Sequence, residues 1–210
     1  FTLASYMIEG GSSRNHLLMK SFMYQQPAAW DRLMHVVRES TRDYLAAQIQ
    51  AGAQAIQLFD SWVGCLAPED YRAYVLPHSR WVLEGLADYD VPRIHFGTNT
   101  TTLLEDMKEA GGEVIGVDWR LPLEQARRII GAGFAVQGNL DPVLLMAPRD
   151  LLVERVKATL AQASPEKGYI FNLGHGVLPP TPMENVEAVI ETVHGHLSGR
   201  TEGAGPGGSS

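Results

Sequence analysis

The sequence has almost no cysteine and no long hydrophobic segment. Cys65 is the only cysteine among 210 residues, so no disulfide bond can form within the chain. That scarcity fits a reducing compartment, and we expect a cytoplasmic protein. No apolar run reaches the roughly 18 residues that a membrane-spanning helix needs, and we therefore expect no membrane partner.

Positive charge is also in short supply. The chain carries 17 Lys and Arg against 24 Asp and Glu, which gives a net charge of -7 at pH 7. Proteins that bind nucleic acids in general concentrate Lys and Arg against the phosphates, so we expect no nucleic-acid partner. No phosphate-binding glycine fingerprint follows any expected strand, because Gly174-His175-Gly176 lacks the third glycine and its spacing.

What the sequence does contain is a regular alternation of short apolar segments and longer helical patterns. This alternation predicts parallel strands joined by crossover helices. The apolar opening segment, residues 1–8, is expected to be the end of a further strand. The five expected strands are residues 55–59, 93–96, 113–117, 134–137 and 169–171.

Helix ends are marked by familiar residue types. Pro68 begins one helix, with two acidic residues in its first turn. Thr181 and Glu184 have the spacing of a capping box at the start of the last helix. Three glycines, Gly52, Gly111 and Gly131, are expected to end helices just before strands.

Polar clusters follow nearly every expected strand. In a closed barrel all such positions meet at one mouth, whereas an open doubly wound sheet concentrates them at a single switch point. We therefore expect an α/β protein of the (β/α)8 TIM barrel class, incomplete here, with about five to six C-terminal βα units. The clusters are Asp60-Ser61-Trp62, Gly97-Thr98-Asn99, Asp118-Trp119-Arg120, Gly138-Asn139-Leu140-Asp141 and residues 172–176.

Two domain features follow from composition. Residues 1–197 carry the strand and helix patterns and are expected to form the partial barrel domain. Residues 198–210 are rich in Gly and Ser and offer almost nothing to bury, so we expect a disordered tail.

His175 lies between two glycines directly after a strand, which predicts either an accessible imidazole at the mouth or an ordinary polar turn.

Several motifs, in one order, give the chain a resemblance to the uroporphyrinogen decarboxylase family. The first, Phe1-Thr2-Leu3-x-x-Tyr6-x-x-Glu9-Gly10, resembles the second half of a signature of that family, whose preceding residues would lie upstream. The others are Ala51-Gly52-Ala53-Gln54, Phe59-Asp60-Ser61, Gly116-Val117-Asp118-Trp119, Gln137-Gly138-Asn139-Leu140-Asp141-Pro142 and Asn172-Leu173-Gly174-His175-Gly176.

The resemblance implies a TIM barrel that decarboxylates the four acetate side chains of uroporphyrinogen III, giving coproporphyrinogen III. It implies a homodimer, no cofactor and no metal. Tyr6, Ser61 and His175 align with positions that contact substrate, and Phe59 is expected to form an apolar wall under the macrocycle. The flanking glycines are expected to let the macrocycle approach His175. The catalytic residue is unknown, because the family's arginine-rich segment, its aspartate and its proton donor are expected upstream of Phe1.

Two other readings stay open. Related corrinoid-dependent methyltransferases hold zinc with a His-x-Cys pair and a later cysteine, and the corresponding stretch here is His95-Phe96-Gly97, without a thiol. Neither Cys65 nor the pair His194-Gly195-His196 is expected to replace those ligands. The other reading is a tetrapyrrole-binding module without turnover.

Overall fold

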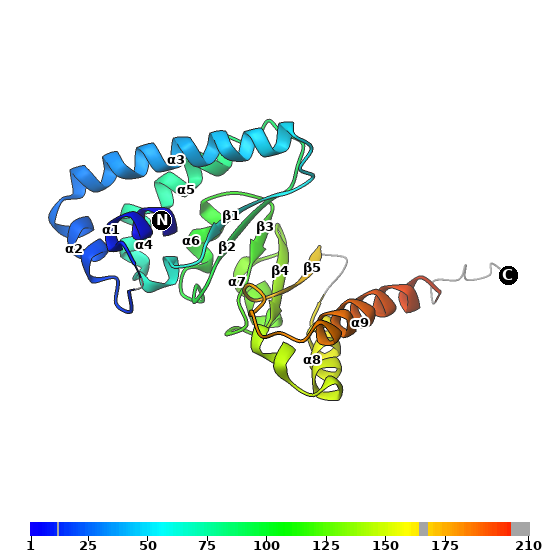
Figure 1. Ribbon diagram of the computed structural model, residues 1–210. Coiled ribbons are helices and arrows are strands. Elements are labelled where there is room, and N and C mark those ends of the chain that lie inside the picture. The colour runs from blue at the N-terminus through cyan, green and yellow to red at the C-terminus, as the bar shows by residue number, and fades with distance from the viewer. Residues whose placement is uncertain (12, 164–167, 203–210) are drawn as a thin grey trace.

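A computed structural model describes residues 1–11, 13–163 and 168–202. Three helices precede the first strand, and from there strands and helices alternate to the end (Figure 1). The strands are β1 (Ile56–Asp60), β2 (Arg93–Gly97), β3 (Val114–Gly116), β4 (Ala135–Leu140) and β5 (Tyr169–Leu173). The α-helices are α1 (Thr2–Glu9), α2 (Leu17–Gln25), α3 (Pro27–Gln50), α4 (Pro68–Tyr74), α5 (Leu76–Glu84), α6 (Leu104–Glu109), α7 (Leu123–Ile130), α8 (Arg149–Ala161) and α9 (Met183–Glu202). Two short 3-10 helices, η1 (Val63–Cys65) and η2 (Pro142–Met146), follow β1 and β4.

The five described strands form one parallel sheet in the order β1-β2-β3-β4-β5. Each strand therefore pairs with its neighbour in the chain, and the order never reverses. A doubly wound sheet reverses its strand order, whereas a barrel winds in one direction. The winding confirms the expected class, an incomplete (β/α)8 barrel, and the five strands lie where the sequence predicts them.

The sheet is curved like part of a barrel wall. The amide nitrogen of Gln137 on β4 donates a 2.8 Å hydrogen bond to the side-chain oxygen of Gln57 on β1. The ring of Phe59 on β1 stacks on the ring of His175, which follows β5. β1 and β5 are the two edges of the sheet, so these contacts cross its inner face and show that this face is concave.

The outer face of the sheet carries the main hydrophobic core. Ile115 and Val136 are fully buried there and pack in one cluster with residues of α5, α6 and α7. A second cluster joins η2, β5, α8 and α9, with Leu152 and Val156 at its centre. Two parts of the sheet are thus covered on the outside by separate groups of helices (Figure 1).

The opening segment is a helix, so the expected strand over residues 1–8 is wrong. Ala4 and Ser5 are buried whereas Leu3 and Met7 are exposed, a spacing that fits a helix lying on a core. Gly10 ends the helix with a positive φ of 67°, a conformation that glycine adopts readily. The apolar composition suggested a strand, but this helical period decides the structure.

Other helix signals had mixed outcomes. α4 begins at Pro68, and α7 ends at Gly131 with a φ of 85°, as expected. The capping box at Thr181 does not form, since α9 begins at Met183 and the buried Thr181 hydroxyl has no hydrogen-bond partner among the described residues. α9 continues to Glu202, past the boundary expected at 197, and residues 203–210 lie outside the described part.

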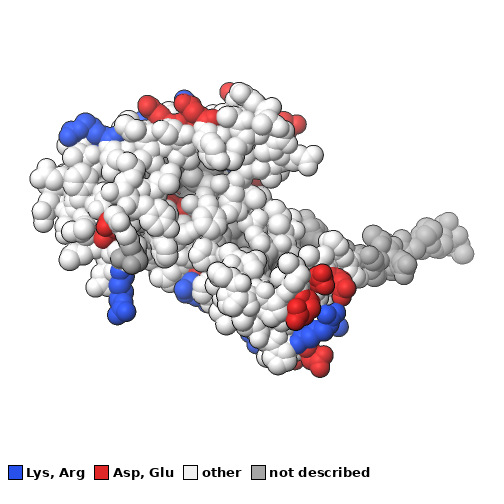
Figure 2. Space-filling model, in the orientation of Figure 1, with Lys and Arg blue, Asp and Glu red and all other residues white. Residues whose placement is uncertain are grey.

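Charged side chains are unevenly placed on the surface. On the face in Figure 2 they gather along α3 and near α8 and α9, and most of the surface between them is uncharged. Among the helices that the structure describes, none combines the length and apolar character that crossing a membrane requires.

Candidate active site

The loops after three strands are tied together by Asp118, which follows β3. Its buried carboxylate accepts hydrogen bonds from the main-chain nitrogens of Asn99 at 2.5 Å and Arg120 at 3.0 Å, and pairs with the Arg120 guanidinium. Its carbonyl oxygen accepts a 2.9 Å bond from the side chain of Asn139 on β4. Carboxylate bonds to main-chain N–H groups are strong, so Asp118 and Asn139 stabilise the shape of the rim.

The loop after β1 is fixed to α1 as well as to β2. The Thr2 hydroxyl donates a 2.7 Å bond to Asp60 at the end of β1 and accepts a 3.1 Å bond from the main-chain nitrogen of Trp62. Between them lies Ser61, which is 5% exposed and whose carbonyl oxygen accepts a bond from the Thr98 hydroxyl. Ser61 is therefore at the mouth, within a tightly bonded loop.

Tyr6 lies on α1 and contacts the loop after β1 at Trp62. Its ring is 53% exposed and meets the Trp62 ring edge-on, with centroids 6.4 Å apart. The Trp62 ring also approaches His16 at 6.0 Å. A cavity of about 100 Å³ adjoins these rings. The structure thus places Tyr6 beside Trp62, the neighbour of Ser61 in the chain.

Phe59, Phe96 and His175 form an aromatic platform on the inner face of the sheet. The Phe59 ring lies 5.0 Å from Phe96 at 28° and 5.8 Å from His175 at 29°. Phe96 and His175 are 6.5 Å apart. Phe96 is 4% exposed, but Phe59 is 47% exposed, so one large apolar surface is open on the concave side. The aromatic platform can cover a flat apolar ligand on one side.

His175 has an unused polar atom beside this platform. Its Nδ1 is buried and makes no hydrogen bond to the part of the chain that the structure describes. A buried polar atom without a partner is costly in a protein, so such an atom at a concave surface suits a ligand that supplies the missing bond. The role of His175 as an accessible imidazole or an ordinary polar turn stays a prediction, since its Nδ1 is buried in this arrangement.

The two glycines beside His175 differ in their surroundings. A Cβ on Gly174 would lie 2.6 Å from the main-chain nitrogen of Trp119, so the loop after β5 packs tightly on the loop after β3. A Cβ on Gly176 would meet nothing within 4 Å. The Gly174 side is therefore filled by protein, and only the Gly176 side has the room that was expected on both.

Phe96 and Trp62 belong to sequence stretches already named, His95-Phe96-Gly97 and Asp60-Ser61-Trp62, but neither ring was predicted to be part of the site. Phe96 is paired in register with Phe59, so the two rings lie on the same face of adjacent strands. Aligning the carboxyl ends of the expected strands would have found Phe96. The partner rings of Trp62 come from α1 and from His16, just before α2, and α1 was expected to be a strand, which concealed that contact.

The residues named for a zinc-dependent site do not assemble at the mouth. His95 is fully buried on the other face of β2, and its Nδ1 lies 3.3 Å from the carbonyl oxygen of Met107 on α6. Burial raises the pKa of the Cys65 thiol to about 11, which keeps it protonated and a poor metal ligand at neutral pH. Nothing in this arrangement favours the methyltransferase chemistry.

A singly wound, curved parallel sheet with an aromatic and polar mouth defines part of an α/β barrel. The solved structure of a methyltransferase from Methanosarcina mazei has the same fold, with a TM-score of 0.73 at 19% identity over 85% of this chain and 52% of that one. The uroporphyrinogen decarboxylase family matches residues 1–196, and the chain belongs to that family.

Curated relatives agree with this assignment. The uroporphyrinogen decarboxylase of Sorangium cellulosum is 54% identical over 194 residues, which are 92% of this chain and 56% of that protein. That of Carboxydothermus hydrogenoformans is 52% identical over 92% of this chain and 55% of its own length. The chain thus spans about half the length of the curated relatives it matches.

Proposed function

We propose that this chain supplies part of the barrel of a uroporphyrinogen decarboxylase, a lyase that removes four acetate carboxyl groups from uroporphyrinogen III to give coproporphyrinogen III. The observation that carries the proposal is the family match over residues 1–196. The aromatic platform beside the unpartnered Nδ1 of His175 supports it from the structure, because a macrocycle with carboxylate arms needs both kinds of surface.

The proposed chemistry needs no cofactor. Decarboxylation needs a place for two electrons, and a pyrrole ring protonated on carbon provides one within the substrate. The protein then binds the macrocycle, places a proton donor and stabilises charge. In this chain Phe59, packed on the buried Phe96, covers the macrocycle, and His175 bonds a substrate carboxylate or the pyrrole region. The proton donor is left unassigned among these residues.

Tyr6 and Ser61 are proposed as further substrate contacts. The exposed ring of Tyr6 supports direct contact from α1. Ser61 is nearly buried, so its hydroxyl reaches a ligand only at the inner surface of the loop after β1. A homodimer and a cytoplasmic location are proposed from the family membership, with the tetrapyrrole as the small-molecule partner.

The test is a turnover assay in which products are separated by carboxyl number. The chain is assayed alone and together with the portion of a curated relative that it does not span, since the exposed Phe59 and Ile170 leave the inner face open. We expect turnover in the mixture. Porphyrin binding without turnover in every mixture would favour the non-catalytic binding module instead.

His175→Asn tests the role of the imidazole in the same assay. A lost hydrogen bond to a charged substrate group costs roughly 1.5–3 kcal/mol, or about ten- to a hundredfold in rate. Partly decarboxylated intermediates are expected to accumulate. The free energy of unfolding should fall by about 0.5–1.5 kcal/mol, because the substitution removes the stacking of the His175 ring on Phe59. His194→Asn, at an exposed position of α9, is the matched control, and equal turnover in both variants would remove His175 from the site.

A further inference from the structure

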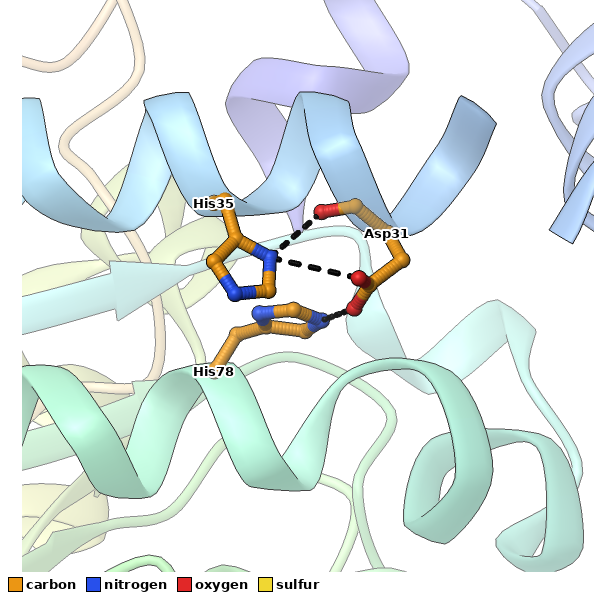
Figure 3. A group of neighbouring side chains, drawn as sticks. All are labelled: Asp31, His35 and His78. Carbon is orange, nitrogen blue, oxygen red and sulfur yellow. Dashed lines mark hydrogen bonds and ion pairs between the residues drawn. The ribbon is translucent and has the colours of Figure 1, made fainter. Parts of the chain in front are cut away.

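A cluster of three possible metal ligands lies between α3 and α5. Asp31 and His35 are one turn apart on α3, and His78 lies in the first turn of α5 (Figure 3). One ligand atom from each side chain lies within 4.8 Å of the other two. Among the described residues this is the group of three His, Cys, Asp or Glu side chains close enough to hold one ion.

The spacing of the ligand atoms fits a small divalent cation. Nε2 of His78 lies 3.5 Å from Oδ1 of Asp31, and Nδ1 of His35 lies 3.4 Å from Oδ2 of the same carboxylate. Ligands about 2.0–2.1 Å from a tetrahedral zinc ion lie roughly 3.3–3.4 Å from one another. The carboxylate therefore already stands at ligand spacing from both imidazoles.

The two helices hold this arrangement in place. One and two turns beyond His35, the guanidinium groups of Arg38 and Arg42 pack on the ring of Trp81 at 4.6 and 4.7 Å, which fixes α3 against α5. Nδ1 of His35 also lies 2.8 Å from the carbonyl oxygen of Asp31, so the ring must turn from this oxygen when Nδ1 binds an ion.

His78 faces Asp31 from the buried side of the cluster. It is 7% exposed along its side chain. A neutral imidazole has the lone pair that a metal needs. Its Nδ1 is buried with no hydrogen bond to the described residues. By contrast, Asp31 and His35 are partly exposed, which leaves the cluster open to an ion from solvent.

We propose that Asp31, His35 and His78 bind a divalent transition-metal ion such as Zn²⁺, with water completing the coordination. Imidazole and carboxylate ligands suit zinc, and three protein ligands with one water is a common zinc arrangement. The ion would join α3 to α5 and stabilise their packing. This departs from the expectation of no metal, and it concerns a place between α3 and α5, where His78 lines a small pocket together with Asp60 at the end of β1.

The test uses the full chain without a histidine tag, treated with a chelator and then titrated with Zn²⁺ against a competing chromophoric chelator. We expect one saturable equivalent. Co²⁺ in place of Zn²⁺ should give the visible absorption typical of tetrahedral coordination. Zn²⁺ should also raise the melting temperature, because a ligand that binds only the folded state stabilises it.

Variants distinguish this site from adventitious binding. Asp31→Asn and His35→Asn change partly exposed side chains, so the fold should persist, and each should lower zinc affinity by about tenfold or more. Asp43→Asn, the same substitution elsewhere on α3, is the matched control and should bind as wild type. No saturable equivalent, or equal affinity in Asp31→Asn and Asp43→Asn, would overturn the proposal. Binding is read on the chain itself, so the result does not depend on turnover.

Discussion

The two faces of the sheet have opposite surroundings although the same strands build both. On the outer face Ile115 and Val136 are fully buried under helices, and His95 is enclosed with them. On the inner face Phe59 is 47% and Ile170 is 40% exposed. Side chains alternate between the faces, so adjacent residues of one strand have different roles. The outer face supplies stability, and the inner face presents a surface for a ligand.

The largest expected difference between the faces is in the free energy of unfolding. Ile115→Ala removes a fully buried side chain from the outer core and should cost about 2–5 kcal/mol. Phe59→Ala removes a half-exposed ring from the inner face and should cost about 1 kcal/mol, because only about half of its area is buried there. Denaturant titration of the two variants measures both values, and equal losses would contradict the comparison.

A second difference concerns acid. Burial lowers the pKa of His78 to about 4 from 6.5, so the imidazole stays neutral in the folded protein down to about pH 4. The unfolded chain takes up that proton below about pH 6.5. Between these values the unfolded state binds more protons, so the free energy of unfolding falls as the pH falls, by at most about 3 kcal/mol from this residue. Burial lowers the pKa of His95 as well, which adds in the same direction.

His78→Asn tests this contribution. With zinc removed by a chelator, the variant should lose less stability than wild type between about pH 6.5 and pH 4, while the remaining slope reports His95 and other groups. Urea titrations at several pH values measure it. If the free energy of unfolding of the variant fell with pH as steeply as that of wild type, His78 would not resist protonation in the folded protein.

Much of the architecture could be predicted from the sequence because strand and helix periods are local. The five strands, the one-directional winding and the rim clusters all follow from short apolar segments and the residues just after them. The opening helix was missed because Phe1 to Ile8 is mostly apolar, and only its packing selects Ala4 and Ser5 for burial. The capping box at Thr181 failed because the helix begins two residues later.

The candidate site was predicted only in part, for a related reason. His175, Phe59 and Ser61 each stand next to a strand end and carry a family motif, so they could be named. The contact between the Phe59 and His175 rings depends on the curvature of the whole sheet, which no local pattern encodes. The cluster of Asp31, His35 and His78 could not be predicted from the sequence, because it forms only where two helices that are separated in the chain pack together.

The smallest expected effect is the difference in stability between alanine variants of the two glycines beside His175, in the loop after β5. A Cβ on Gly174 would lie 2.6 Å from the main-chain nitrogen of Trp119 and 3.0 Å from its ring, so Gly174→Ala must push two loops apart. Such overpacking typically costs about 1–3 kcal/mol.

Gly176→Ala is the matched control, because its Cβ would enter open space, and it should stay within about 0.5 kcal/mol of wild type. Since Gly174 donates a 2.7 Å main-chain bond to Leu140, its displacement should also move His175 away from the aromatic platform. The two effects are separable: thermal melts report the loss of stability, and porphyrin fluorescence titration reports the platform. Equal melting temperatures for the two variants would show that the loop after β5 does not pack tightly on the loop that contains Trp119. The rim would then be less rigid than the hydrogen bonds around Asp118 imply.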